Sequence, residues 1–227
     1  MTRTRTGNAA GTVCMALALA LGATACGGNS EDSGKREFVA AEELCEGAFP
    51  PAAARALETV TGEKQFNQNS TGEGVSGTAE ALSEEFRSYY GADGSPWDDH
   101  DFCRVHTEKS ASRPDVWISF EILDSDRLDG DADTSPEFDV YPMGRTALSG
   151  ERRALVFFEC ASSGMNSEES PALIMAVMHM WEAAVQGRKA KEANMTVLHS
   201  AALAVARELK CEDDGGLPAA PVLRPAP

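Results

Sequence analysis

The sequence predicts an α+β domain in which helices pack on one side of a mainly antiparallel sheet. Residues 115–123 and 153–160 are rich in β-branched and aromatic side chains, which favour strands. Residues 51–61 and 193–211 instead place apolar side chains at helical spacing. Because each helix and the sheet must bury an apolar side, the two kinds of element are expected to pack as layers.

The first 25 residues are organised like a secretory signal peptide, and they are excluded from the fold. Arg3 and Arg5 form a positive start, and residues 13–21 form an apolar run. This run is too short to span a membrane, which takes roughly 20 apolar residues. Ala-Thr-Ala then precedes Cys26 and resembles a bacterial lipobox, in which the cysteine is diacylated and begins the mature protein. The alternative is ordinary cleavage after Ala-Thr-Ala, which would give a free secreted protein.

The net charge of the chain disfavours some classes of binding partner. With 36 acidic and 20 basic residues among 227, the formal net charge is −16, and removal of residues 1–25 takes it to −18. Nucleic acid is therefore not an expected partner, because phosphate binding needs a basic surface. We expect contact with the membrane through lipid on Cys26, on the extracytoplasmic face, after export by the general pathway.

The mature chain divides into three parts. Residues 26–36 are small and polar and are predicted to be a flexible tether. Residues 37–214 are the candidate globular region. Residues 215–227 are rich in proline and glycine and are predicted to be a disordered tail.

Two helices are expected to open the globular region. The first is predicted at 51–61, where Pro51 suits the first turn and Gly62 suits a left-handed cap. The second is predicted to start after Thr78 as its N-cap. Strands are then expected at 102–107 and 115–123.

The second half is expected to contain strands and a final helix. Residues 138–142 lead into a hairpin around Ser149-Gly150, followed by a buried strand at 153–160 and a helix at 193–211. Residues 171–180 fit two interpretations. Methionine, alanine and leucine favour a helix there, whereas the spacing of the chain favours a strand, which we prefer.

That spacing also suggests two similar halves. Cys103 precedes Val116 by thirteen residues, and Cys160 precedes Leu173 by the same number. With Cys14 removed and Cys26 lipidated, an even number of cysteines remains, which favours two disulfides in an exported domain. Three pairings are possible, and a zinc site is disfavoured because no CxxC spacing occurs. The halves favour Cys45–Cys103 and Cys160–Cys211 as a hypothesis.

Three segments resemble a group of uncharacterised actinobacterial lipoproteins: the lipobox at Cys26, LCEGAFPPAAARALETVTG from Leu44, and ALAVARELKC ending at Cys211. The resemblance covers most of the mature chain, and its motifs are structural. It implies a bacterial envelope as the location and implies no catalytic mechanism.

Four sets of residues have the chemistry of a site but a more ordinary explanation. The carboxylates at 129, 131 and 133 resemble a calcium loop but lack its glycine and glutamate. Residues 97–101, WDDHD, combine a tryptophan, carboxylates and a histidine, with Tyr89 and Tyr90 nearby. His179, and His199 beside Ser200, have no acid partner in a fixed position. Several methionines are expected in the core. They are Met165, Met175, Met178, Met180 and Met195.

We therefore expect no catalytic residues, metal site or cofactor, and no enzyme activity. The expected function is a non-catalytic binding or interaction module of the cell envelope, whose protein or small-molecule partner the sequence does not identify. The alternatives are an envelope hydrolase with a scattered site and a purely structural lipoprotein.

Overall fold

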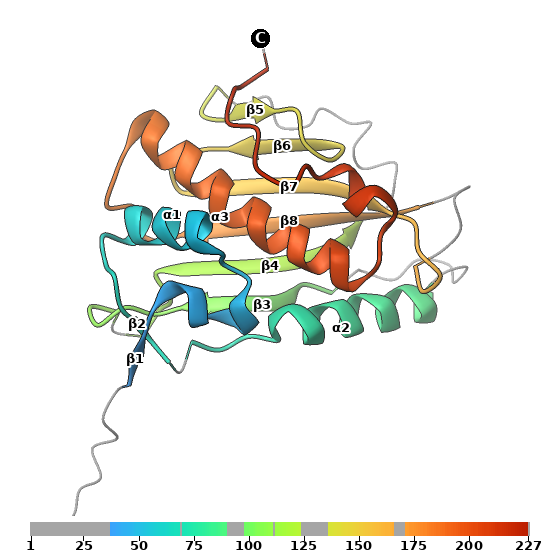
Figure 1. The fold of residues 1–227 in the computed structure, drawn as a ribbon, viewed down its shortest axis with the longest axis horizontal. Helices are drawn as coiled ribbons and strands as arrows, with labels where there is room; N and C mark the ends of the chain where they lie inside the picture. The colour runs from blue at the N-terminus through green and yellow to red at the C-terminus, as the bar shows by residue number, and fades with distance from the viewer. Residues whose placement is uncertain are drawn as a thin grey trace, which may run out of the picture. The chain divides into compact units, whose positions relative to one another are not determined.

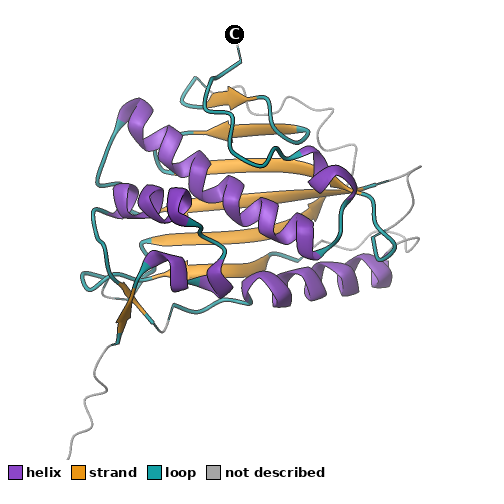
Figure 2. Cartoon of the chain, viewed as in Figure 1, coloured by secondary structure: helices purple, strands orange, loops and turns teal. Residues whose placement is uncertain are grey.

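Six antiparallel strands form the main sheet, in the order β3-β4-β8-β7-β6-β5, and the helices lie on one side of it (Figures 1 and 2). The strands are β3 (His100–Val105), β4 (Val116–Leu123), β5 (Asp139–Tyr141), β6 (Thr146–Ser149), β7 (Arg153–Cys160) and β8 (Ala172–Met180). The helices are α1 (Pro51–Thr61), α2 (Gly74–Tyr89) and α3 (Gly187–Glu208). The predicted α+β class is confirmed, and so is the strand at 171–180.

The computed structural model describes residues 37–68, 70–89, 98–110, 112–123, 136–165 and 171–226, without the side chain of Tyr89. Residues Arg36–Pro227 form one compact unit. The signal peptide, Cys26, the tether and the acidic loop at 124–133 lie outside the described residues. Two short strands, β1 (Phe38–Val39) and β2 (Phe66–Asn67), pair separately. The described residues also include the 3-10 turns η1 (Ala41–Glu43), η2 (Cys45–Gly47) and η4 (Glu212–Gly216).

The two faces of the sheet are both apolar but differ in what packs on them. Even-numbered residues of β4, β7 and β8 point toward the helices and form the main core with α1, α2 and α3. Odd-numbered residues point to the opposite face, here called the second face, where a smaller buried cluster lies. That cluster consists of Leu123, Leu148, Leu155, Phe157, Leu173 and Val177.

A bulge in β3 makes both His100 and Cys103 point to the helix side of the sheet. The pairing with β4 shifts between Asp101 and Cys103, so that Phe102 is an extra residue. Without the bulge, His100 and Cys103 would point to opposite faces, since side chains alternate along a strand. With it, both face the helices, and Phe102 is buried against Phe120, with ring centroids 5.3 Å apart. Simple alternation along the predicted strand 102–107 would place Phe102 on the same face as Arg104.

The two predicted disulfides are present. Cys45 of η2 bonds to Cys103 of β3, and Cys160 of β7 bonds to Cys211, which lies between α3 and η4. The similarity of the two halves is limited to the sheet. The hairpins β3-β4 and β7-β8 meet at β4 and β8, but α1 and α2 precede their hairpin whereas α3 follows its own.

Two helices begin earlier than predicted because distant carboxylates hold their first turns. The Ser76 N–H of α2 donates to Glu46 Oε2 at 2.8 Å, and the Gly187 N–H of α3 donates to Glu151 Oε1 at 2.9 Å. Both carboxylates lie at the positive end of a helix, where the first N–H groups lack partners within the helix. Thr78, the predicted N-cap, is instead buried inside α2.

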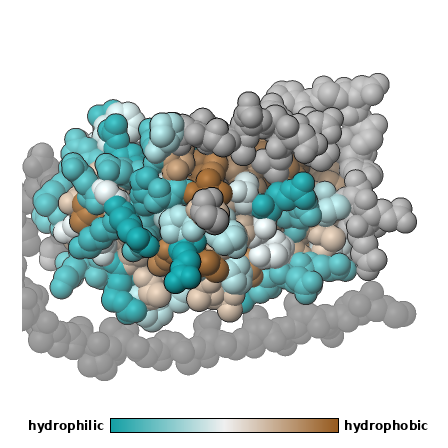
Figure 3. Space-filling view, turned by 90° about the horizontal axis from the view of Figure 1, so that it is seen from above, coloured by the Kyte–Doolittle hydropathy of each residue, from teal (hydrophilic) through white to brown (hydrophobic). Residues whose placement is uncertain are grey.

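The C-terminal segment 217–226 differs from the expected disordered tail. Leu217 is buried in the main core, and Leu223 packs against it. The Ala226 N–H donates to the Val140 carbonyl at 2.7 Å, which pairs part of the free edge of β5. The proline content keeps this segment extended, while its leucines bind it to the domain. Seen from the β5 side, the described surface is mainly hydrophilic, with small apolar areas (Figure 3).

Replacing Cys160 and Cys211 by serine should lower the free energy of unfolding by about 4 kcal/mol on the chain-entropy account, because the disulfide closes a loop of 51 residues. Urea denaturation of the oxidised wild type and the double variant measures the difference. The Cys45–Cys103 bond stays intact in both and serves as the internal control. A loss below 1 kcal/mol would contradict the expectation.

Candidate functional site

A groove of about 320 Å³ lies where α3 meets the start of α1 and the C-terminal segment. On α3 its lining follows one stripe of the helix, at positions 196, 199, 203 and 207. The opposite wall comes from Gly47, Ala48 and the first turn of α1. Residues 219–221 contribute the third side, so the docking of the C-terminal segment completes the groove.

The groove exists because the side chains around it are small. Ala52 and Ala53 of α1 and Ala204 of α3 line it, and Ala219 and Ala220 line the third side. Two helices in contact through alanines leave space that larger side chains would fill. Most of the lining is apolar, which is typical of small-molecule sites, although the volume is at the lower end of their range.

His199 is the most unusual residue of the groove. It is 2% exposed, and its ring hydrogen bonds to the backbone of Pro218. Because proline has no N–H, the imidazole must donate to the Pro218 carbonyl, which leaves Nε2 as an acceptor in the neutral ring. Nε2 has no hydrogen-bond partner among the described residues. A buried acceptor without a partner costs roughly 1–3 kcal/mol, so a donor reaching this nitrogen would be stabilising.

Ser200 and His199 do not form a catalytic pair. Ser200 Oγ donates to the Ala48 carbonyl at 2.8 Å, whereas His199 donates to Pro218. The two neighbours diverge around the helix, so each holds a different wall of the groove. Arg207 lies at the other end of the stripe and pairs with Asp214, with 3.0 Å between Nε and Oδ2. Both side chains of this pair are exposed, so it contributes at most about 1 kcal/mol.

The WDDHD residues that the structure describes do not converge. His100 turns toward α2, where its Nε2 lies 2.7 Å from Oε2 of the buried Glu85. The Asp98 N–H donates to the same carboxyl group. Asp101 points to the second face instead. There it accepts from Trp117 Nε1 at 2.8 Å and pairs with Arg104 at 2.6 Å.

The remaining sequence candidates are dispersed or lie outside the described residues. The carboxylates at 129–133, Trp97, Tyr90 and the side chain of Tyr89 lie outside them. His179 lies on the second face, and its ring stacks on Trp117 with centroids 5.7 Å apart. Four of the five methionines are buried in the main core, and Met175 packs on the second face. Within the described ranges, no group of three or more His, Cys, Asp or Glu side chains could hold a metal ion.

The groove was not predicted from the sequence. The sequence feature related to the groove is the excess of alanine around positions 48–56 and 201–206. By itself this excess predicts only close packing of helices. The C-terminal segment, which forms one wall, was expected to be disordered. None of the helices in the described ranges is long and apolar enough to cross a membrane.

The protein is thus an α+β domain that is cross-linked by two disulfides and has an apolar groove between its helices. Comparison of the chain with protein-family models, curated proteins and solved structures finds no match.

Burial lowers the pKa of His199, the Pro218 hydrogen bond raises it, and the nearby Arg207 charge lowers it, with a net lowering. An unfolded histidine titrates near pH 6.5, so below about that pH the unfolded chain takes up a proton that the folded chain resists. Stability should therefore fall as the pH drops below 6.5. Urea unfolding at pH 7 and pH 5 should show a smaller loss for His199→Gln than for the wild type. An equal loss in both proteins would contradict this reasoning.

Proposed function

We propose that this protein is a lipid-anchored, extracytoplasmic binding module whose α1–α3 groove holds a small, mainly apolar ligand. The observation that carries the proposal is the groove itself, with its apolar lining and the unpartnered Nε2 of His199. The ligand class follows from these two features: an apolar body with one N–H or O–H donor. No catalytic step is proposed, because His199 and Ser200 each bind a separate backbone carbonyl.

The location rests on independent grounds. The two disulfides fit an oxidising, extracytoplasmic compartment. The signal-like residues 1–25 and the lipobox-like sequence before Cys26 support export and lipidation. With a net charge of −18, the mature chain would be repelled by an anionic membrane surface, so a covalent lipid is the anchor that the proposal requires.

Replacing Cys26 by alanine should abolish acylation, because alanine has no thiol to carry the lipid. Metabolic labelling with a palmitate analogue should mark the wild type and not the variant. Cys14→Ala serves as the matched control, since Cys14 lies in the signal peptide and should not affect the label. Labelled Cys26→Ala protein would refute the anchor without affecting the groove.

The groove can be tested with N-phenyl-1-naphthylamine, a fluorescent apolar probe that carries a single N–H donor. In the Cys26→Ala background, which removes the lipid, Ala52→Trp fills the groove from its α1 side. Probe affinity should fall at least fivefold, because the indole occupies the volume that the probe needs. Fluorescence titration measures the affinity.

Ala81→Trp is the matched control, because Ala81 is a half-buried alanine of α2 outside the groove lining. Its affinity for the probe should equal that of the background chain. Equal affinities in Ala52→Trp and Ala81→Trp would reject the groove as the binding site. That result would leave the anchor prediction standing.

A further inference from the structure

The turn between β6 and β7 presents two consecutive arginines beside a second pocket. This pocket has a volume of about 460 Å³ and is lined by residues that include Phe138, Arg152, Arg153 and Lys191. It lies away from the α1–α3 groove and shares no lining residue with it. Phe138 also packs against the cluster on the second face, so the pocket has an apolar wall.

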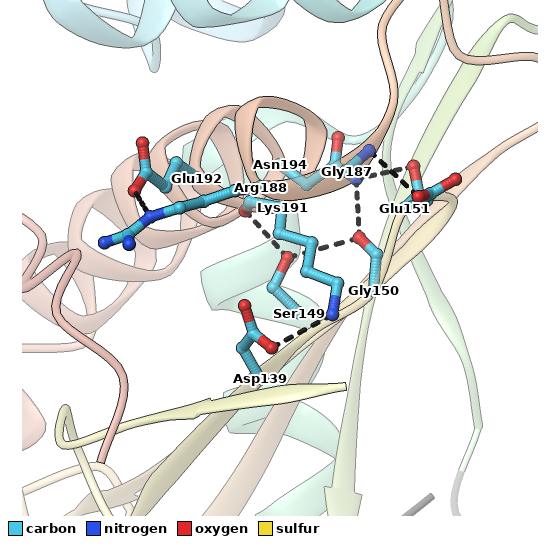
Figure 4. A network of polar contacts seen from close by, with 9 residues as sticks. All are labelled: Asp139, Ser149, Gly150, Glu151, Gly187, Arg188, Lys191, Glu192 and Asn194. Atoms are coloured by element: carbon cyan, nitrogen blue, oxygen red, sulfur yellow. Dashed lines mark hydrogen bonds and ion pairs between the residues drawn. The ribbon is translucent and has the colours of Figure 1, made fainter. Parts of the chain in front are cut away.

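The turn is held rigidly from α3 (Figure 4). Asn194, which is fully buried, donates through Nδ2 to the carbonyls of Gly150 and Glu151, at 3.0 Å each. Ser149 Oγ donates to the Lys191 carbonyl at 2.8 Å. These bonds fix the backbone immediately before the arginines, so the arginines start from a preorganised position.

Among the described residues, no carboxylate pairs with the two arginines of the turn. Neither Arg152 nor Arg153 forms an ion pair within the described residues, although Arg104, Arg145, Arg188 and Arg207 each do. The adjacent residue Glu151 accepts from the Gly187 N–H, and the Lys191 ammonium pairs with Asp139 at 3.0 Å. Glu137 also borders the pocket and is exposed. Both arginine side chains are exposed, so they are open to an anion from solution.

Arg153 also begins a row of side chains across the second face. The strand register places it opposite His179, which lies opposite Trp117, which lies opposite Arg104. Trp117 and His179 stack, and Arg104 lies 5.8 Å from the indole centroid. The row places Arg153 opposite the His179 ring, on which the charges of both Arg153 and Asp99 act.

We propose that the Arg152–Arg153 pocket binds a phosphate group attached to an apolar or aromatic moiety that packs on Phe138. The planar guanidinium groups match the oxygens of a phosphate, and Phe138 supplies the apolar contact. This site goes beyond the α1–α3 groove and does not depend on it. The phosphate could belong to a soluble ester or to a lipid headgroup, and the experiment separates these sources.

Titration calorimetry of the Cys26→Ala chain with phenyl phosphate and with inorganic phosphate tests the pocket. Phenyl phosphate should bind at least fivefold more tightly, because only it can contact Phe138. The double variant Arg152→Gln/Arg153→Gln should bind phenyl phosphate at least tenfold more weakly. The control Arg55→Gln/Lys210→Gln loses the same charge at exposed positions outside the pocket and should bind like the background chain.

The pKa of His179 can be used to detect a phosphate bound at Arg153. Burial lowers the pKa of His179, Arg153 lowers it further, and Asp99 raises it. A phosphate bound against Arg153 offsets that charge, so saturating phenyl phosphate should raise the pKa of His179 measured by NMR. In Arg153→Gln the pKa should be higher at the start and should not respond to phenyl phosphate.

Sedimentation with phosphatidylglycerol vesicles, compared with phosphatidylcholine vesicles, identifies the source of the phosphate. Arginine-dependent binding to the anionic vesicles assigns the pocket to a lipid headgroup, and binding of phenyl phosphate alone assigns it to a soluble ester. Loss of binding in the Arg55→Gln/Lys210→Gln control equal to that in the arginine variant would overturn the proposal. Failure of every probe to bind would overturn it too, while leaving the α1–α3 groove untouched.

Discussion

The packing of α3 against the sheet is the constraint on which the other features depend. This helix contacts β6, β7 and β8 below it and α1 and α2 beside it. Val197, Leu198, Ala201, Ala202 and Val205 have no exposed surface. The chain that follows α3 enters the Cys160–Cys211 disulfide and then forms one wall of the groove. A shift of α3 would therefore disturb the core, the groove and the β6–β7 turn together.

The two candidate sites use different sides of this helix. The stripe at 196, 199, 203 and 207 faces the groove, whereas Lys191 and Asn194, near its first turns, hold the β6–β7 turn. The helix thus serves as a rigid support for an apolar site at one place and a cationic site at another. Sites supported by a packed helix are positioned more accurately than sites on free loops.

The two arginines of the β6–β7 turn have no carboxylate partner among the described residues. In this respect they differ from Arg104, which pairs with Asp101, and from Arg145, which pairs with Glu159. Glu151, which precedes them in the sequence, accepts instead from the Gly187 N–H at the start of α3. Arg152 and Arg153 are exposed, which leaves both cations accessible to a ligand.

Local patterns were sufficient to predict much of this protein. The bounds of α1, the alternation in β4 and β7 and the strand nature of β8 follow from propensity, period and spacing, because these act between near neighbours in the chain. The disulfide pairings, which join residues 58 and 51 apart, were a hypothesis that the structure confirms. Tertiary contacts decided the rest. The starts of α2 and α3 depend on Glu46 and Glu151, which lie 30 and 36 residues away from the N–H groups they accept from. The order of the C-terminal segment depends on a core that its own composition does not reveal. Both candidate sites combine residues from three or more segments, and only the folded chain brings those segments together.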